Sequence, residues 1–143
     1  MSKFILDRAE DLEKWDAFVE KSPQGTFFSL SFYLNAVGQP FDLLYVIKGK
    51  EIRAGIVLIK DTCGNSILHD YIIYNGLLFS SQPKNQNSVK RLSDEFEILT
   101  FVSSALPQLI PKLKLALSPE IKDLRPFMWH NYNAENSAKW KLD

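Results

Sequence analysis

The chain has 143 residues, of which 45% are hydrophobic and 24% are charged, as expected of one soluble globular domain. Its 17 basic and 17 acidic residues give a formal net charge of +0, so the sequence lacks the basic excess that nucleic-acid binding requires. A net charge near zero also gives little repulsion between copies of the chain, which favours association, for instance as a homodimer.

The single cysteine, Cys63, excludes an intrachain disulfide, which fits a reducing compartment. The first residues contain too short an apolar run for a signal peptide, and no later run is as long as a membrane span. We therefore expect a cytoplasmic protein without a membrane span. Cys63 lies in an expected turn with no histidine nearby in the sequence, and we interpret it as a bystander thiol.

The chain begins with a strand and a helix. Residues 3–6 form a short apolar strand candidate, and Asp7 is placed to N-cap a helix over about 8–21. Apolar residues recur on one face of this helix at helical spacing, namely Leu12, Trp15, Phe18 and Val19.

A turn at 22–25 ends this helix, because it contains both a proline and a glycine. A second, short helix is expected to be capped by Ser29 or Ser31 and to end at Val37. Gly38 follows at the position where a helix end favours a left-handed residue.

The middle of the chain predicts a hairpin. Residues 41–48 and 51–60 are both apolar and β-branched, and Gly49 and Lys50 form a tight turn between them. The two segments should therefore pair as antiparallel strands.

A further strand is expected after a second turn at 61–65. Residues 66–73 are apolar enough to form it. Asn75 and Gly76 interrupt the pattern before 77–79, so we expect this strand to bend or bulge at that point.

A polar loop at 80–88 leads into a long helix over about 89–106, which Pro107 and Pro111 should end. Residues 112–117 then predict a last buried strand. The face of the long helix that should pack on the sheet consists of Leu92, Phe96, Leu99 and Val102 or Ser103.

These elements give the order β-α-α-β-β-β-α-β, which predicts an α/β or α+β layer fold with one mixed sheet and helices on both faces. The connection from Phe79 to Lys112 should be a right-handed crossover between parallel strands. We expect residues 1–117 to form the domain and residues 118–143 to form an irregular aromatic tail.

His69, Asp70 and Tyr71 form the densest titratable cluster in the middle of the chain. His69 could act as a general base, because its ordinary pKa is close to neutral. Neighbours in a strand point to opposite faces, however, so His69 and Asp70 cannot form a dyad by adjacency. The sequence favours a half-buried histidine with one satisfied hydrogen bond.

No motif indicates a bound metal or a nucleotide-binding loop. Two histidines cannot build the usual zinc site, and neither His-x-x-x-His nor Cys-x-x-Cys spacing occurs. The chain also lacks a Gly-x-Ser-x-Gly elbow, a Walker loop and a Rossmann fingerprint, so nothing in it supports a hydrolase, kinase or dehydrogenase.

Residues 123–132 concentrate three aromatic residues, an arginine, an aspartate and a histidine. Pro126 favours an extended backbone at Arg125, so we expect an extended run in which Asp123 and Arg125 share one side. The two could form a bidentate salt bridge, or Arg125 could bind a phosphate or carboxylate of a donor substrate.

The aromatic residues of the same segment have two interpretations. Phe127 and Trp129 would share a side and could stack on a sugar or close over the core, and we expect at least one of them to be buried. His130 could hold a hydroxyl or carboxylate of a substrate.

The element order resembles the first part of the GNAT acyltransferase fold. Three segments also resemble FemAB-like proteins, which are tandem GNAT-like acyl or aminoacyl transferases of cell-wall and surface-polysaccharide assembly. The first segment runs from Trp15 through Ser22-Pro23-Gln24-Gly25-Thr26-Phe27-Phe28. The second, with Asn75 in place of the first glycine of the Tyr-Gly-Gly-Leu pattern, is Tyr74-Asn75-Gly76-Leu77. The third, similar to an Asp-x-Arg-Pro-Phe-x-Trp pattern, is Asp123-Leu124-Arg125-Pro126-Phe127-Met128-Trp129.

The resemblance implies an N-acyltransferase in which an amine of a cell-envelope or surface-polysaccharide precursor attacks a thioester or ester. It also implies two GNAT-like halves, so this chain would be the N-terminal half, inactive alone, with a tail leading toward a missing C-terminal half. The catalytic residues stay unassigned. The residues implied to bind a small-molecule or glycan-precursor substrate are Tyr74, Asp123, Arg125, Trp129 and His130.

Catalytic GNAT domains place a glycine-rich loop after the fourth strand, where its N–H groups bind the pyrophosphate of CoA. Residues 80–88 contain no glycine, and Pro83 removes one donor. We therefore expect this half to bind no cofactor, while the full-length enzyme would use an acyl-CoA or aminoacyl-tRNA donor. The alternative is a non-catalytic GNAT-like module for binding or oligomerisation.

Overall fold

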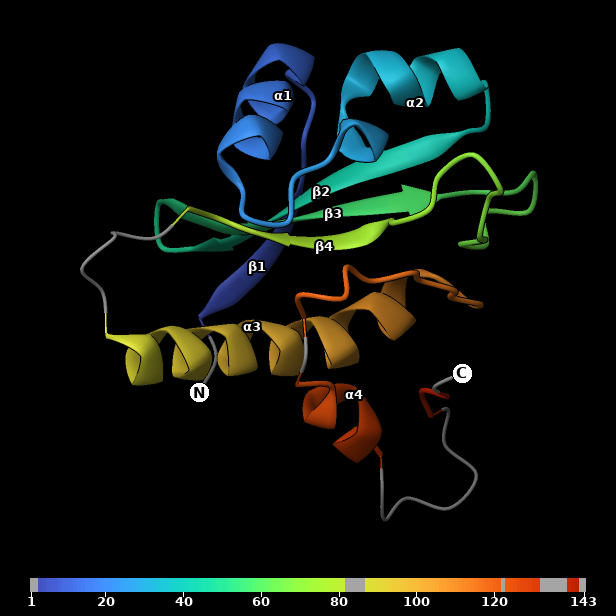
Figure 1. The fold of residues 1–143 in the computed structure, drawn as a ribbon. Helices are drawn as coiled ribbons and strands as arrows, with labels where there is room; N and C mark the ends of the chain where they lie inside the picture. Colours follow the sequence, from blue (N-terminus) through green and yellow to red (C-terminus); the bar gives the residue numbers. More distant parts are fainter. Residues whose placement is uncertain (1–2, 82–86, 122, 132–138, 142–143) are drawn as a thin grey trace.

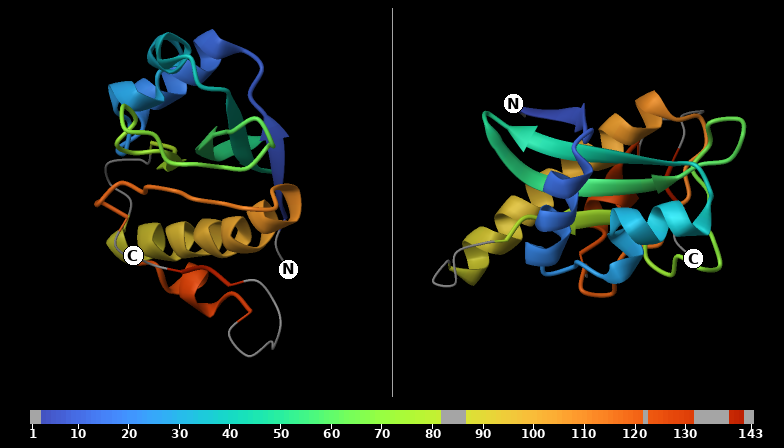
Figure 2. Two further views of the ribbon diagram at one scale, coloured as in Figure 1. Left: turned by 90° about the vertical axis from the view of Figure 1, so that its right-hand side faces the viewer. Right: turned by 90° about the horizontal axis from the view of Figure 1, so that it is seen from above.

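The computed structural model describes residues 3–81, 87–121, 123–131 and 139–141. In this part of the chain, four antiparallel strands form one sheet with helices on both faces (Figures 1 and 2). In the order in which they lie in the sheet, the strands are β1 (Phe4–Arg8), β2 (Phe41–Lys48), β3 (Glu51–Ile59) and β4 (Gly76–Phe79). The helices are α1 (Leu12–Lys21), the short 3₁₀ turn η1 (Phe27–Ser29), α2 (Ser31–Val37), α3 (Ser88–Leu109) and α4 (Arg125–Trp129).

The first helix begins later than the sequence predicted. The carboxylate of Asp11 accepts hydrogen bonds from the backbone N–H groups of Glu13 and Lys14, at 3.1 and 3.2 Å, and so caps α1. The expected cap, Asp7, is wrong because its backbone belongs to β1, where it pairs with Tyr45 of β2. Strand pairing therefore competes successfully with helix formation at this point.

The second helix ends as predicted but begins differently. Gly38 has a φ of +85° and terminates α2 in the left-handed conformation. At the other end, neither expected serine acts as the cap. The Asp16 carboxylate on α1 instead accepts hydrogen bonds from the N–H and the hydroxyl of Ser31, at 2.8 and 2.6 Å. A neighbouring helix thus supplies the group that satisfies the start of α2.

The predicted hairpin of β2 and β3 is confirmed, with Gly49 in the left-handed conformation at its turn. The predicted strand over 66–73 is wrong, because that segment forms only isolated bridges, Lys60 with Ser66 and His69 with Ile72. Ser66 bonds instead to a distant part of the chain, donating its N–H and hydroxyl to the carbonyls of Lys112 and Lys114.

The predicted last strand, 112–117, is also wrong, and so is the parallel crossover, since the described sheet is antiparallel throughout. The segment lies beside the start of β4 and is hydrogen-bonded there to Asn75. The Asn75 N–H donates to Ala116 O at 2.9 Å, and Ala116 N–H donates to Asn75 Oδ1 at 2.8 Å. A side-chain oxygen thus occupies the place of a ladder carbonyl.

Two apolar cores fill the two faces of the sheet. On the α1 and α2 face, Trp15 is fully buried and donates its Nε1–H to Ser29 O at 2.8 Å. Gly55 of β3 lies under its ring, where an added Cβ would be 2.8 Å from Trp15. The other core packs the sheet against the buried side chains of α3, namely Ile98, Leu99, Val102 and Leu106.

The inward face predicted for the long helix is therefore wrong in its first half. Leu92 is 63% exposed and Phe96 only half-buried. The first turns of α3 extend past the edge of the described sheet (Figure 2), so that part of the helix has no strand to pack against. The periodic pattern identified a helix correctly, but not the length over which the helix has a packing partner.

Pro107 does not end α3, which continues to Leu109. Proline has no N–H to donate to the carbonyl four residues earlier, here that of Ser103. The indole of Trp140 fills this gap, since its Nε1–H donates to Ser103 O at 2.9 Å while its ring packs edge-on against Phe127 at 4.9 Å. Trp140 is thus anchored to the carbonyl of Ser103, which would otherwise lack a hydrogen-bond donor because of the proline.

The segment around Pro126 is a short helix, α4, and the extended run predicted for it is wrong. A proline in the first turn of a helix loses no hydrogen bond, and Phe127 and Met128 both donate to Leu124 O. The expected burial of one aromatic residue is confirmed by Phe127, which lies in the α3-side core, whereas Trp129 is 56% exposed. Tyr132, at the end of the predicted segment, lies outside the described residues.

We expect Trp140→Ala to lower the free energy of unfolding by about 2–3 kcal/mol, because it removes both the ring packing and the hydrogen bond. Trp140→Phe should lose about 1 kcal/mol, the value of the bond to Ser103. Urea denaturation measures both. Trp129→Ala is the control and should lose less than about 1 kcal/mol, because that ring is exposed. Equal losses at the two tryptophans would contradict the anchoring role of Trp140.

Candidate functional site

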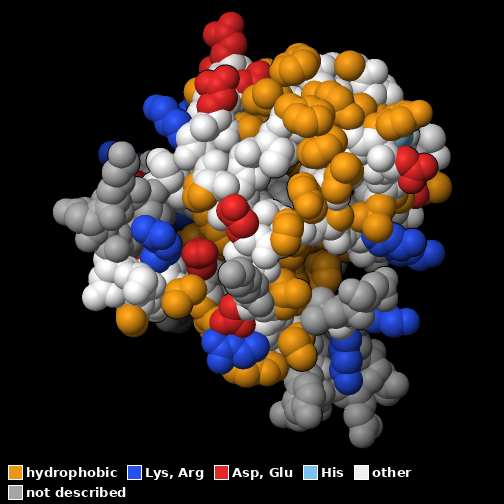
Figure 3. Space-filling view, in the orientation of Figure 1, with side chains coloured by type: hydrophobic (Ala, Val, Ile, Leu, Met, Phe, Trp, Pro, Cys, Tyr) orange, Lys and Arg blue, Asp and Glu red, His pale blue; other side chains and the backbone are white. Residues whose placement is uncertain are grey.

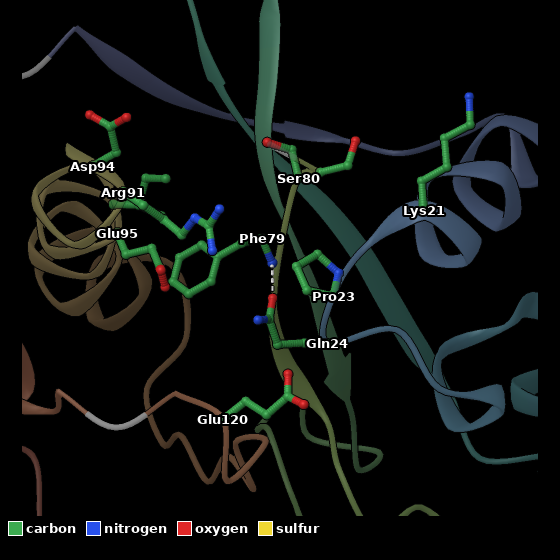
Figure 4. Close-up of a pocket in the computed structure, with 11 residues that line it drawn as sticks. Lys21, Pro23, Gln24, Phe79, Ser80, Arg91, Asp94, Glu95 and Glu120 are labelled. Carbon is green, nitrogen blue, oxygen red and sulfur yellow. Dashed lines mark hydrogen bonds between the residues drawn. The ribbon is translucent and has the colours of Figure 1, made fainter. Parts of the chain in front are cut away.

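A cleft of about 450 Å³ lies at the end of β4 (Figure 4). Its walls come from the turn after α1, from the N-terminal half of α3 and from the segment that follows residue 117. The polar side chains around it include Lys21, Gln24, Arg91, Glu95 and Glu120.

The wall at the turn is fixed by hydrogen bonds to the edge of β4. Ser80 N–H donates to Arg53 O on β3, so the backbone groups of Phe79 point to the other side, away from the sheet. There Phe79 N–H donates to Gln24 Oε1 at 2.9 Å, and Ser22 Oγ donates to Phe79 O at 2.7 Å. Two side chains therefore satisfy the backbone N–H and C=O groups of Phe79, which another strand would otherwise pair with.

The turn that carries these side chains is itself tightly constrained. Gly25 N–H donates to Ser22 O at 3.0 Å. An added Cβ at Gly25 would lie 1.9 Å from the carbonyl oxygen of Val19. Only glycine fits there, and the close return of the chain is what brings Gln24 to Phe79.

Acidic and basic groups both line the cleft. The side chains of Glu95, Glu120 and Arg91 point into the space beside the Gln24 amide (Figure 4). Burial raises the pKa of Glu95, and the nearby Arg91 guanidinium opposes that shift. A half-buried carboxylate with a raised pKa can accept a proton more readily than an ordinary glutamate. The cleft can therefore hold a cationic or hydrogen-bonding group.

The structure brings three of the five predicted site residues together. Arg125 donates to both carboxylate oxygens of Asp123, at 2.8 and 2.6 Å, and these bonds lower the pKa of Asp123. The guanidinium of Arg125 also lies 5.2 Å from the ring centre of Phe96 and 5.4 Å from that of Trp129. The bidentate pair predicted from the sequence is thus present, on the exposed side of α4.

The other two predicted residues lie elsewhere. Tyr74 lines a small hollow together with Gln24 and packs edge-on against Phe28 at 6.3 Å. His130 lines another hollow, with Trp140, near the end of α3. The five predicted residues therefore occupy three places, and the cleft beside β4 is lined by none of them.

The polar residues of the cleft were missed as site residues. Gln24 stood in a segment that resembles a family pattern, so a signal for it was present. Glu95 and Glu120 gave no signal, because isolated acidic residues on a helix or in a loop are ordinarily solvated. His69 accepts a hydrogen bond from Tyr71 N–H at 3.2 Å, in a turn rather than the predicted strand.

Among the described residues, no group of three or more His, Cys, Asp or Glu side chains is arranged to hold a metal ion. None of the helices in that part of the chain has the length and hydropathy needed to cross a bilayer.

Comparison of the chain with protein-family models, with curated proteins and with solved structures found no match. The fold and the cleft define a mixed α/β domain with a four-stranded antiparallel sheet and an open, charged site at its edge strand.

Replacing Gln24 by leucine keeps the side-chain volume but removes the acceptor for Phe79 N–H. We expect a loss of about 1–3 kcal/mol in the free energy of unfolding, together with faster amide hydrogen exchange at Phe79. Gln108→Leu, at an exposed position of α3, is the matched control and should change neither value. An unchanged rate of amide hydrogen exchange at Phe79 in the Gln24 variant would show that this hydrogen bond does not protect the edge of β4.

Glu95→Gln should stabilise the chain at neutral pH. Because the folded-state pKa of Glu95 is raised, the stabilising effect of its protonation is present at acidic pH and is lost as the pH rises through that pKa. Glutamine stays neutral at every pH. The variant should therefore be more stable than the wild type above the folded-state pKa of Glu95, and equally stable below the ordinary pKa of glutamate. Thermal unfolding over a pH series measures the difference. Glu97→Gln is the control, because this exposed glutamate lies 3.8 Å from Lys48 and should not gain.

Proposed function

We propose that this chain is the acceptor-side, N-terminal GNAT-like half of a FemAB-like acyl or aminoacyl transferase. The acceptor is an amine of a cell-envelope or surface-polysaccharide precursor, and the half alone is inactive. The observation that carries the proposal is a contact between two of the family-like segments. Ser22 and Gln24 from one bond directly to Phe79, at the end of the strand that begins in the other, and the cleft opens at this contact.

The chemistry of the cleft suits an amine acceptor. Glu95 and Glu120 can hold an ammonium group by charge-assisted hydrogen bonds, and Arg91 can bind an anionic part of the same substrate. In the transfer, the amine nitrogen forms a bond to the donor carbonyl carbon, and the bond from that carbon to sulfur or oxygen breaks. The amine must first lose a proton, and Glu95, whose pKa is raised by burial, is suited to accept it.

The predicted substrate-binding residues Tyr74, Asp123, Arg125, Trp129 and His130 keep that role in the proposal. Arg125 and Trp129 are exposed and His130 is half-buried, so a second half could cover them. An acyl-CoA or aminoacyl-tRNA donor would then bind mainly to that half, because the loop at 80–88 has no glycine.

Calorimetric titration tests the proposal. The chain should bind a UDP-linked amino sugar with a free amine, and bind the same nucleotide sugar about tenfold more weakly once the amine is acetylated. Glu120→Gln should remove this preference, whereas Glu97→Gln, outside the cleft, should keep it. Acetyl-CoA should not bind, and the chain should not transfer acetyl groups.

Two results would contradict the proposal. One is equal binding of the free and the acetylated amine. The other is acetyl transfer by this chain that His130→Ala abolishes, because the half would then be catalytic by itself.

A second candidate function, a non-catalytic GNAT-like module for binding or oligomerisation, is favoured by an exposed aromatic surface on α2 and its neighbours. Failure to bind either ligand, with self-association, would support that module.

A further inference from the structure

An aromatic surface covers the face of the molecule near η1 and α2, and among its members only Tyr74 belongs to the proposed substrate-binding residues. Figure 3 shows hydrophobic side chains gathered there in one area, with the charged side chains lying around it. We call this area the aromatic patch. Ring contacts and the hydrogen bond from Tyr33 connect five of its members, Phe27, Phe28, Tyr33, Tyr71 and Tyr74. The sixth, the exposed Ile73, is included because it lies between Tyr71 and Tyr74 in the sequence. Phe27, Tyr71 and Ile73 are 53%, 69% and 57% exposed.

The rings of the aromatic patch are held in place by one another. The Phe27 and Phe28 ring centres lie 4.2 Å apart, and Tyr33 packs edge-on against both, at 5.0 and 5.7 Å. The hydroxyl of Tyr33 donates to Tyr71 O, which ties η1 and α2 to the loop before β4. A rigid aromatic surface loses little conformational entropy when a partner covers it, which is a property of binding surfaces.

The size of the aromatic patch fits the centre of a protein interface. Half-exposed side chains of this kind present about 500 Å² of apolar surface together, near the upper range for the largest patch on a monomer. A standard interface buries about 800 Å² on each partner, with an apolar centre and a polar rim. The patch supplies that centre, and the charged groups around it supply a rim.

We propose that the aromatic patch is the interface of a homodimer, in which a second copy of this chain covers it. Its six members carry no charge, so like can face like across a two-fold axis without repulsion between buried charges. The formal net charge of +0 adds no long-range repulsion between copies at neutral pH. Homodimer interfaces are also the more apolar class, as this surface requires.

A second apolar area, on the first turns of α3 and on α4, is the rival surface. Val89, Leu92 and Trp129 are exposed there. The paired charges of Asp123 and Arg125 lie beside Trp129, so a symmetric dimer formed here would bury two such pairs, one from each copy. This second area is therefore a poorer dimer surface, and it serves as the control.

Sedimentation velocity of the chain over a wide concentration range tests the proposal. The wild type should show a reversible monomer–dimer equilibrium. Ile73→Lys should raise the dimer dissociation constant by about tenfold or more, because it puts a charge on each copy into the apolar contact. Leu92→Lys is the matched control, since it introduces the same charge at an aliphatic residue of similar exposure, and it should leave the equilibrium unchanged.

A second variant, in another element, separates a true loss of dimerisation from misfolding of the Ile73 variant. Phe27→Ser, in η1, should also weaken the dimer, and circular dichroism and the urea midpoint check that the variant monomer is folded. A chain that stays monomeric at all concentrations would overturn the proposal. So would a dimer that survives both patch variants, or one that Leu92→Lys disrupts instead. Because no substrate takes part, these outcomes do not depend on the proposed transferase function.

Discussion

The outer edge of β4 determines how the rest of the molecule is arranged, because no strand of the described residues pairs with it. At its start, Asn75 bonds through both its backbone and its side chain to Ala116. At its end, Ser22 and Gln24 bond to Phe79. An edge with open N–H and C=O groups invites pairing with another chain, and here side chains and an irregular segment occupy it instead. The two partners come from opposite directions, and the cleft opens where they diverge.

Local patterns were sufficient wherever neighbours in sequence are also the structural partners. The hairpin of β2 and β3 has the predicted turn at Gly49, because two apolar runs joined by a two-residue turn are a local property of the sequence. Gly38 follows the same rule, since a helix end needs only its own last residues. The choice of Asp11 over Asp7 as the cap of α1 could not be made locally, because it depends on pairing with β2, more than thirty residues away in the chain.

Two of the remaining errors share one physical cause, which is that distant side chains replaced backbone partners. The pattern at 112–117 is that of a strand, but the Asn75 side chain takes the position of a ladder acceptor, and the described sheet stays antiparallel. Pro107 would normally end a helix, but Trp140 satisfies the carbonyl of Ser103 that the proline leaves open. The cleft belongs to the same class, because Glu95 and Glu120 meet only after the chain has folded and share no spacing that a sequence pattern could reveal.

The cleft and the aromatic patch are adjacent in the fold, and this joins their chemistry. Gln24 lines both the cleft and the small hollow that contains Tyr74, and the ring of Tyr74 packs against Phe28 of the patch. A second copy seated on the aromatic patch would therefore stand at the rim of the site. Tyr74 belongs both to the aromatic patch and to the proposed substrate-binding residues, so association and acceptor binding would be coupled through this side chain.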